Sequence, residues 1–230
     1  ASDVIVAVAG DHLDFIGEEK STATLEMQGG QTALLDALAK TGKPMVVVLI
    51  NSKPLVLPAP VKGARAILEA FNPGMEGGRA IGEAVFGQLN PSGKLTISFP
   101  VHVGQQPVFY NQVRGQHGTR YADLTQEPLF PFGHGLGYTT YKYSNARLAS
   151  STLARGQAAT VSVDVENTGR RAGDEVGQVY VSDVVTSVTW VNKALRGFAR
   201  VHLEPGEKKA VSVSLPWEAF QLVDTDGRSV

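Results

Sequence analysis

The spacing of apolar residues differs between the first and the last part of the chain, and each spacing predicts a different kind of structure. Before residue 100, short apolar runs alternate with helical patterns, in the order 4–8, 31–40, 45–50, 66–71 and 79–86, and a last apolar run follows at 95–99. Strands that alternate with helices predict β-α-β units around a parallel sheet that is buried on both faces. We therefore expect residues 1–100 to form a three-layer α/β/α sandwich domain with a mostly parallel sheet, in which 95–99 is the last strand.

The first helical pattern has an apolar face and a defined end. It would place Leu34, Leu35 and Leu38 on one stripe of a helix. It ends before Gly42-Lys43-Pro44, because glycine closes helices and proline cannot continue one. The pattern thus predicts a helix over residues 31–40 with its leucines on one stripe.

The remaining chain changes character twice. Between residues 101 and 140 the periodicity fades, and aromatic residues, proline and glycine take over. Because this stretch is so aromatic, we expect a linker that lies across a folded surface. From residue 141, apolar and polar residues alternate at 159–165, 177–182 and 209–215, with glycine-containing turns between them. Short alternating strands separated by turns predict an antiparallel β-sandwich over residues 141–230.

Composition and charge exclude several partners. The 21 basic residues nearly balance the 22 acidic ones, so no net field would hold a polyanion, and nucleic acid is not expected to bind. The longest apolar runs are far shorter than the roughly 20 residues of a membrane-spanning helix, so no membrane partner is expected. The absence of cysteine excludes disulfides and thiolate metal sites. Because the chain opens directly on an alternating strand, we expect it to be a piece of a longer polypeptide.

The histidines do not form a metal-binding pattern. They are scattered, and no His-x-x-x-His or carboxylate spacing accompanies them. No metal and no cofactor are therefore expected. A bound dinucleotide is also disfavoured, because no Gly-x-Gly-x-x-Gly follows the first strand. The histidines are His12, His102, His117, His134 and His202.

A series of motifs occurs in a fixed order along the chain. In the first part these are Gly17-Glu18-Glu19-Lys20-Ser21, Asn72-Pro73-Gly74-Met75-Glu76-Gly77-Gly78, Phe86-Gly87-Gln88-Leu89-Asn90-Pro91-Ser92-Gly93 and Phe130-Pro131-Phe132-Gly133-His134-Gly135-Leu136-Gly137-Tyr138. The last part adds Val165-Glu166-Asn167-Thr168-Gly169, Gln178-Val179-Tyr180-Val181 and Leu195-Arg196-Gly197-Phe198. Over essentially the whole chain, the series resembles the C-terminal half of bacterial family 3 glycoside hydrolases of the β-glucosidase type. The resemblance implies an α/β sandwich domain followed by a fibronectin type III-like domain.

The resemblance implies part of an enzyme. Members of the family begin with a TIM-like barrel that carries an aspartate nucleophile in a Ser-Asp-Trp-like stretch, and no such stretch occurs in these residues. The implied partner is therefore an N-terminal barrel of the same enzyme, and the chain alone is expected to be inactive. The implied reaction is retaining hydrolysis of terminal β-D-glucosyl residues from an oligosaccharide or an aryl β-glucoside. A periplasmic or secreted location is also implied, and a homo-oligomer stays open.

The resemblance also implies a general acid/base in the loop after the first strand. The family's Glu-x-x-Ser spacing falls on Glu18 and Ser21, so Glu18 is the candidate and Glu19 the runner-up. The position of the loop agrees, since loops that leave the C-terminal ends of parallel strands carry ligand groups in α/β sheets. The alternative is that Glu18 and Glu19 are merely a solvated acidic pair.

Two features of this loop count against the assignment. The family often shows Arg-x-Asp and Leu-Pro downstream, whereas residues 22–28 read Thr-Ala-Thr-Leu-Glu-Met-Gln, which puts the anchoring of the loop in doubt. The ammonium group of Lys20 would favour the charged form of a neighbouring carboxyl group, which is the wrong form for an acid. Unless Lys20 points away, burial by the substrate has to compensate.

A second interpretation is a non-catalytic carbohydrate-binding or spacer module, since fibronectin-like domains often serve only as spacers. Trp190 bears on it, because relatives more often show Arg-Pro at this place and an exposed indole can stack on a sugar ring. A tryptophan in a β-sandwich belongs more often to the core. An N-terminal barrel with an aspartate nucleophile in the parent polypeptide would separate the enzyme from the module.

Overall fold

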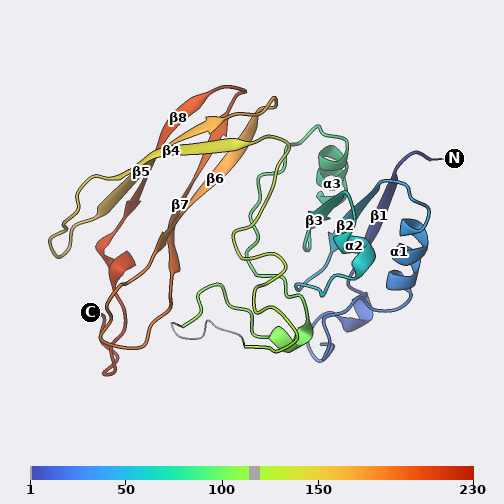
Figure 1. Ribbon diagram of the computed structural model, residues 1–230, viewed down its shortest axis with the longest axis horizontal. Helices are drawn as coiled ribbons and strands as arrows, with labels where there is room; N and C mark the ends of the chain where they lie inside the picture. Colours follow the sequence, from blue (N-terminus) through green and yellow to red (C-terminus); the bar gives the residue numbers. More distant parts are fainter. Residues whose placement is uncertain (1, 114–119) are drawn as a thin grey trace. The chain divides into compact units, whose positions relative to one another are not determined.

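In the computed structural model, which describes residues 2–113 and 120–230, the chain forms two compact units (Figure 1). Unit 1 comprises Ala1–Leu89, Ile97–Val108 and Glu127–Pro131, and unit 2 comprises Asn90–Thr96, Phe109–Gln126 and Phe132–Val230. The first holds a parallel sheet with helices and the second holds antiparallel sheets, which confirms the expected fold class. None of the helices in the described part of the chain has both the length and the apolar character that crossing a membrane requires.

Unit 1 is built around a parallel sheet with the strand order β1-β2-β3. The central strand is β2, which pairs along its whole length with β1 and over four residues with β3. The strands are β1 (Ile5–Gly10), β2 (Met45–Ile50) and β3 (Ala66–Glu69), and the helices are α1 (Gln31–Ala39), α2 (Ala59–Lys62) and α3 (Gly77–Val85), with 3-10 turns at Leu13–Phe15 and Val103–Gln105.

The core of unit 1 lies around β2 and one face of α1. The middle residues of β2 are fully buried, because a central parallel strand is covered on both faces. In α1, Leu35 is buried and Leu38 is half-buried, but Leu34 is 59% exposed. The leucine stripe of α1 is therefore only partly buried, with Leu34 at its exposed edge. With 3.6 residues per turn, neighbouring positions point in different directions, and the buried face of α1 runs through Leu35 and Leu38.

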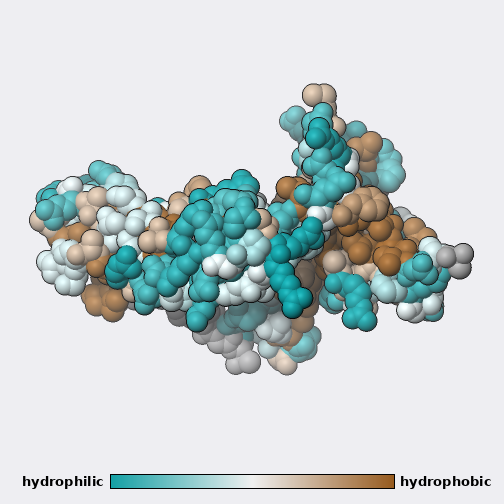
Figure 2. Space-filling view, turned by 90° about the horizontal axis from the view of Figure 1, so that it is seen from above, coloured by the Kyte–Doolittle hydropathy of each residue, from teal (hydrophilic) through white to brown (hydrophobic). Residues whose placement is uncertain are grey.

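One face of β1 is apolar at the surface. Val6 and Val8 point to the same side, because side chains alternate along a strand, and they are 49% and 63% exposed. Figure 2 shows hydrophobic residues gathered on unit 1 at the side where the chain begins. The described residues thus leave this part of the sheet open to solvent.

Unit 2 is a sandwich of two antiparallel sheets, with the strand orders β4-β5-β8 and β6-β7. The three alternating runs of the sequence coincide largely with β5, β6 and β8. Leu203 and Leu215, which end β7 and β8, are among the fully buried residues of its core. The strands are β4 (Tyr141–Leu148), β5 (Ala159–Asn167), β6 (Gly173–Val181), β7 (Ala194–Leu203) and β8 (Lys208–Leu215), followed by a 3-10 turn at Trp217–Phe220.

The expected strand at residues 95–99 does not form. The Leu95 N–H donates to the carbonyl of His134 within unit 2, whereas the Phe99 N–H donates to the carbonyl of Phe130 within unit 1. The two ends of the run thus belong to different units. What remains of the strand is an isolated antiparallel bridge between Phe99 and Phe130.

Glycines of the aromatic stretch pack closely onto an earlier turn within unit 2. A Cβ on Gly135 would lie 2.1 Å from the carbonyl oxygen of Gly93, and a Cβ on Gly137 would lie 2.6 Å from the carbonyl oxygen of Pro91. Side chains cannot occupy these positions without a shift of the backbone. The close approach explains why this motif alternates glycine with larger residues.

Candidate active site

The loop that carries Glu18 leaves the carboxyl end of β1 through Gly10. Gly10 has a φ of 152°, and a Cβ there would lie 1.9 Å from the carbonyl oxygen of Ile50, so the position requires glycine. The side-chain amide of Gln31, at the start of α1, binds Gly10 twice. Its Oε1 accepts the Gly10 N–H at 2.9 Å, and its Nε2 donates to the Gly10 carbonyl at 2.8 Å. The starting point of the loop is therefore fixed by both β2 and α1.

The outgoing side of the loop is fastened to the residues that follow β2. The Asp11 N–H donates to the carbonyl of Ile50 at 3.0 Å. Oδ2 of Asp11 accepts hydrogen bonds from the N–H and the hydroxyl of Ser52, at 2.7 and 2.6 Å. Hydrogen bonds to a charged carboxylate are stronger than neutral ones, so this is a firm anchor. A 3-10 turn at Leu13–Phe15, capped by the side chain of His12, follows directly.

The returning side of the loop is fastened to the same segment. Nζ of Lys53 donates to the Thr22 hydroxyl oxygen at 2.6 Å, and the Val56 N–H donates to the Leu25 carbonyl at 2.9 Å. Glu26 and Val56 then form a parallel bridge. The stretch in which the sequence departs from the resembled pattern therefore supplies its own anchors.

Glu18 and Glu19 lie between these two anchored sides, and both side chains are exposed. Gly17 and Glu19 have φ values of 109° and 62°, in a region that residues other than glycine seldom adopt, so the backbone turns sharply at the tip. The Lys20 N–H closes this turn on the carbonyl of Gly17 at 3.2 Å. The Lys20 side chain is exposed, where solvent and salt screen its charge. The loop thus presents two carboxyl groups at its tip.

A glutamate that the sequence interpretation missed lies at the end of β3. Burial raises the pKa of Glu69 to about 7, and the charge of Asp11 acts in the same direction. The hydrogen bond from the Phe71 N–H, at 2.8 Å, and the neighbouring side chain of Asn51 act in the opposite direction. Asn51 directly follows β2 and is fully buried. The available signal was a single acidic residue at the end of an otherwise apolar strand, Ala66–Glu69.

The described residues bring together no group of three His, Cys, Asp or Glu side chains placed to hold a metal ion. The histidines have other places in the structure. His12 and His102 cap 3-10 turns, and His202 binds a carboxylate of β6 at 2.8 Å. Burial lowers the pKa of His134. His117 lies outside the described residues.

Comparison with known families assigns both units. The family model described as the glycosyl hydrolase family 3 C-terminal domain matches residues 1–138, and the model of the fibronectin type III-like domain matches residues 175–230. The chain belongs to glycosyl hydrolase family 3. The resemblance indicated by the motifs is thus confirmed, including the order of the two domains.

Relatives of this family 3 chain are β-glucosidases and β-xylosidases. A β-xylosidase of Formosa agariphila is 43% identical over 100% of this chain and 32% of its own length. A periplasmic β-glucosidase of Salmonella typhimurium is 43% identical over 96% of this chain and 30% of its own length. The family 3 chain therefore spans about a third of the length of the curated relatives it matches.

Solved structures of β-glucosidases contain the same fold over nearly the whole of this chain. A β-glucosidase involved in saponin metabolism from intestinal bacteria matches with a TM-score of 0.93 and 50% identity. The β-glucosidase of Listeria innocua in complex with glucose matches with a TM-score of 0.93 and 35% identity. Each match covers 99% of this chain and 33% of the other one.

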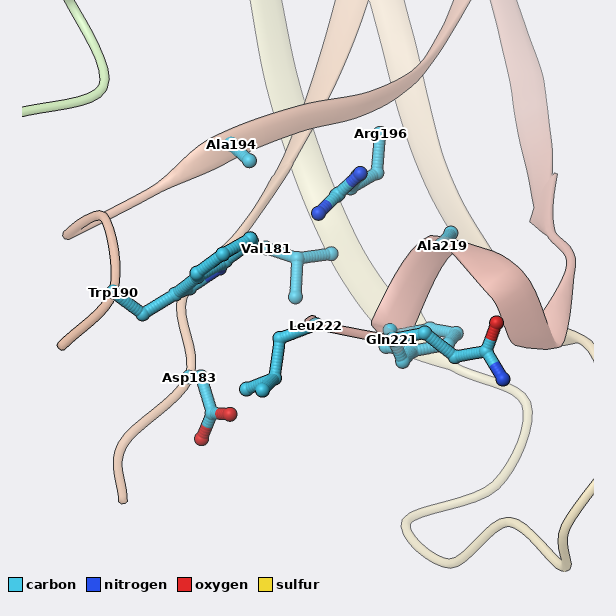
Figure 3. Close-up of a pocket in the computed structure, with 9 residues that line it drawn as sticks. Val181, Asp183, Trp190, Ala194, Arg196, Ala219, Gln221 and Leu222 are labelled. Carbon is cyan, nitrogen blue, oxygen red and sulfur yellow. The ribbon is translucent and has the colours of Figure 1, made fainter. Parts of the chain in front are cut away.

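The fibronectin type III-like unit of this family 3 chain has a small pocket with Trp190 in its wall (Figure 3). Asp183 and Arg196 add charged groups to the lining. The indole is half-buried and is directed into the pocket, toward the apolar side chains of Val181 and Leu222. One side of the Trp190 indole is therefore covered by the sandwich, and the side chain is not fully exposed.

Proposed function

We propose that this chain supplies the general acid/base of a retaining β-glycosidase, and that Glu18 is that residue. The reaction is the exo-acting hydrolysis of terminal β-D-glucosyl residues. The nucleophile is an aspartate on an N-terminal TIM-like barrel of the same enzyme. Family membership and the β-glucosidases among the relatives support this proposal.

The placement of Glu18 is the observation that carries the proposal. Its carboxyl group is exposed at the tip of a loop whose two sides are both fastened to the segment after β2. A loop held in this way can extend a carboxyl group over a neighbouring domain with a defined geometry. Retaining glycosidases need such precision, because their two carboxyl groups must lie roughly 5 to 5.5 Å apart.

The two steps of the reaction give Glu18 two roles. It first donates a proton to the glycosidic oxygen while the nucleophile attacks the anomeric carbon, and it then takes a proton from the water that releases the sugar. The first role requires the neutral acid. Because Glu18 is exposed in this chain, the substrate and the barrel have to supply the desolvation that favours the neutral form.

The relatives support the proposed substrate and the proposed location. Glucosyl is the proposed sugar because both solved relatives described above are β-glucosidases, and the aglycone is a short oligosaccharide or an aryl group. A periplasmic or secreted location is proposed on the support of the periplasmic relative from Salmonella typhimurium.

The test uses the polypeptide that carries both this chain and the barrel. Glu18→Ala should lower kcat on aryl β-glucosides with poor leaving groups by at least about a hundredfold, the usual contribution of general acid catalysis. A good leaving group such as dinitrophenolate departs without protonation, so the covalent intermediate should form and accumulate. Azide attacks the anomeric carbon without needing a base, and should restore turnover with a β-glycosyl azide as product.

Glu19→Ala is the matched control, because it removes an adjacent exposed carboxyl group from the same loop. It should keep the leaving-group dependence of the unmodified enzyme and gain nothing from azide. Azide rescue of Glu19→Ala, with near-normal activity of Glu18→Ala, would transfer the role to Glu19. Normal turnover by both variants would reject an acid/base in this loop and leave the chain as a carbohydrate-binding or spacer module.

A further inference from the structure

Three parallel strands bring polar side chains to one edge of the sheet in unit 1. Asp11 follows β1, Asn51 follows β2 and Glu69 ends β3, and the carboxyl ends of parallel strands meet at the same edge. The side chain of Asn51 lies close enough to the Glu69 carboxyl group to affect its pKa, and the charge of Asp11 acts on the same group. The acid/base chemistry proposed for Glu18 makes no direct use of this cluster.

Two oxygen atoms of the cluster are buried without a donor. Within the described residues, Oε2 of Glu69 and Oδ1 of Asn51 make no hydrogen bond although both atoms are buried. The other atom of each group is engaged. Oε1 of Glu69 accepts the Phe71 N–H at 2.8 Å, and Nδ2 of Asn51 donates to the Lys53 carbonyl at 2.8 Å. An ionised Glu69 would leave both oxygens as acceptors without a donor, which is a costly arrangement in a protein interior.

One proton on Glu69 satisfies both groups. An ionised carboxyl group only accepts hydrogen bonds, whereas a neutral one offers an O–H donor and an acceptor oxygen. We propose that the Glu69 carboxyl group is protonated in the folded protein and donates from Oε2 to Oδ1 of Asn51, and that Glu69 thereby positions the loop that carries Glu18. The pKa of about 7, raised by burial, agrees with this protonation state.

Asn51 links the Glu69 carboxyl group to the Glu18 loop through hydrogen bonds. Its Nδ2 orders the turn that contains Ser52 and Lys53. Ser52 binds the outgoing side of the Glu18 loop, and Lys53 binds the returning side. The bond from Glu69 to Asn51 therefore fixes the segment on which both sides of the loop depend.

Loss of the proton would disturb this segment in two ways. An ionised Glu69 cannot donate, so Oδ1 of Asn51 again lacks a donor. The new negative charge also faces Asp11, the charged group that acts on Glu69 from the loop after β1. Repulsion between the two carboxylates opposes the anchor between Asp11 and Ser52. We therefore expect the Glu18 loop to be held more firmly below about pH 7 than above it.

The effect on catalysis rests on the proposed role of Glu18, whereas the proton on Glu69 and the order of the loop do not. The two can be measured separately. In the 230-residue chain, the ¹³C resonance of the Glu69 carboxyl group should titrate with a midpoint near pH 7. The amide resonances of Ser52 and Val56 should shift with the same midpoint.

Two variants define the role of the donor. Glu69→Gln cannot titrate but keeps a hydrogen-bond donor, an amide N–H, toward Asn51, so its loop amides should keep their low-pH resonances throughout. Glu69→Ala removes the donor, and hydrogen-exchange protection of the Ser52 amide should fall by about tenfold, the factor expected when a buried hydrogen bond is left unmade. Glu69→Gln provides the test even where Glu69→Ala fails to fold.

A kinetic measurement extends the test to the polypeptide that also carries the barrel. For substrates with poor leaving groups, Glu69→Gln should move the alkaline limb of the kcat profile to higher pH and leave KM below pH 6 unchanged. A side chain that merely supported the fold would not move this limb. The conservative amide also separates protonation from packing, because it has nearly the same shape as the acid.

Each outcome bears on one part of the proposal. A Glu69 resonance that titrates at its ordinary pKa of 4.5 would overturn the proposal entirely. A midpoint near pH 7 with loop amides that do not follow it would overturn the positioning role and leave the proposed role of Glu18 intact. Loop amides that follow Glu69, in an enzyme whose Glu18→Ala variant is fully active, would support the positioning of the loop and reject the acid/base.

Discussion

The ammonium group of Lys94 lies 3.4 Å from the carboxylate of Glu175, and their side chains are only 18% and 12% exposed. Glu175 also accepts a hydrogen bond from the Tyr143 hydroxyl at 2.8 Å. Lys94 belongs to the segment Asn90–Thr96 and Glu175 belongs to β6, so the pair fastens this segment to the sandwich within unit 2. Lys94→Met should lower the unfolding free energy of unit 2 by about 2 kcal/mol, because it leaves a nearly buried carboxylate without its cation.

The double variant of Lys94→Met with Glu175→Gln should recover part of this loss, since it removes both charges together. Urea unfolding followed by tryptophan fluorescence measures the change, because both tryptophans, Trp190 and Trp217, lie in unit 2. An unchanged midpoint for Lys94→Met would show that solvent replaces the ion pair at no cost.

Substitution of glycine by alanine should have opposite effects on stability at two positions. Gly135→Ala places a Cβ 2.1 Å from the backbone oxygen of Gly93, so it should destabilise unit 2 by about 2 kcal/mol or more. Gly82 lies inside α3, where no described atom comes within 4 Å of the added Cβ, so Gly82→Ala should stabilise the helix by up to about 1 kcal/mol. Thermal unfolding followed by circular dichroism compares the variants, and a shift of the same sign in both would contradict the packing described here.

Local sequence patterns predicted most of the strands, but they did not predict the polar cluster of Asp11, Asn51 and Glu69. The six apolar residues of β2 follow Pro44 and precede Asn51, and such a run fits best in the middle of a buried parallel sheet. The exposure of Leu34 could not be predicted, because it depends on which face of α1 meets the sheet. Glu69 was missed for a related reason: its environment is created where three strand ends meet, and residues distant in sequence form that environment. Glu18 was proposed from a family motif, whereas the anchors of its loop became visible only in the fold.

The raised pKa of Glu69 makes the stability of unit 1 depend on pH. The folded protein holds this proton up to about pH 7, whereas the unfolded chain releases it near pH 4.5, so stability is full below pH 4.5 and is lost as the pH rises through 7. Because solvent partly screens the group, we expect a loss of about 2 kcal/mol across this window. Glu69→Gln should remove the slope in urea unfolding followed by circular dichroism. Equal slopes in the two proteins would contradict the raised pKa.

The isolated chain should not hydrolyse an aryl β-glucoside, because the proposed acid/base, Glu18, would act without the nucleophile that forms the covalent intermediate. Release of nitrophenolate from a concentrated preparation measures this. The same chain with Glu18→Ala is the control for a contaminating glycosidase. Equal, trace release from both preparations is the expected result, and release that depends on Glu18 would contradict the division of the active site between two domains.

The chain passes from one unit to the other after residues 89, 96, 108, 126 and 131. A single crossover between two related genes, anywhere in this region, would therefore give a product in which segments of one unit come from a different parent than the rest of that unit. Contacts such as the one between Lys94 and Glu175 would then join residues that come from different parent genes. The two units are consequently expected to be inherited as one block. An exchange of residues 132–230 alone would leave the segments of unit 2 between residues 90 and 126 with the original parent.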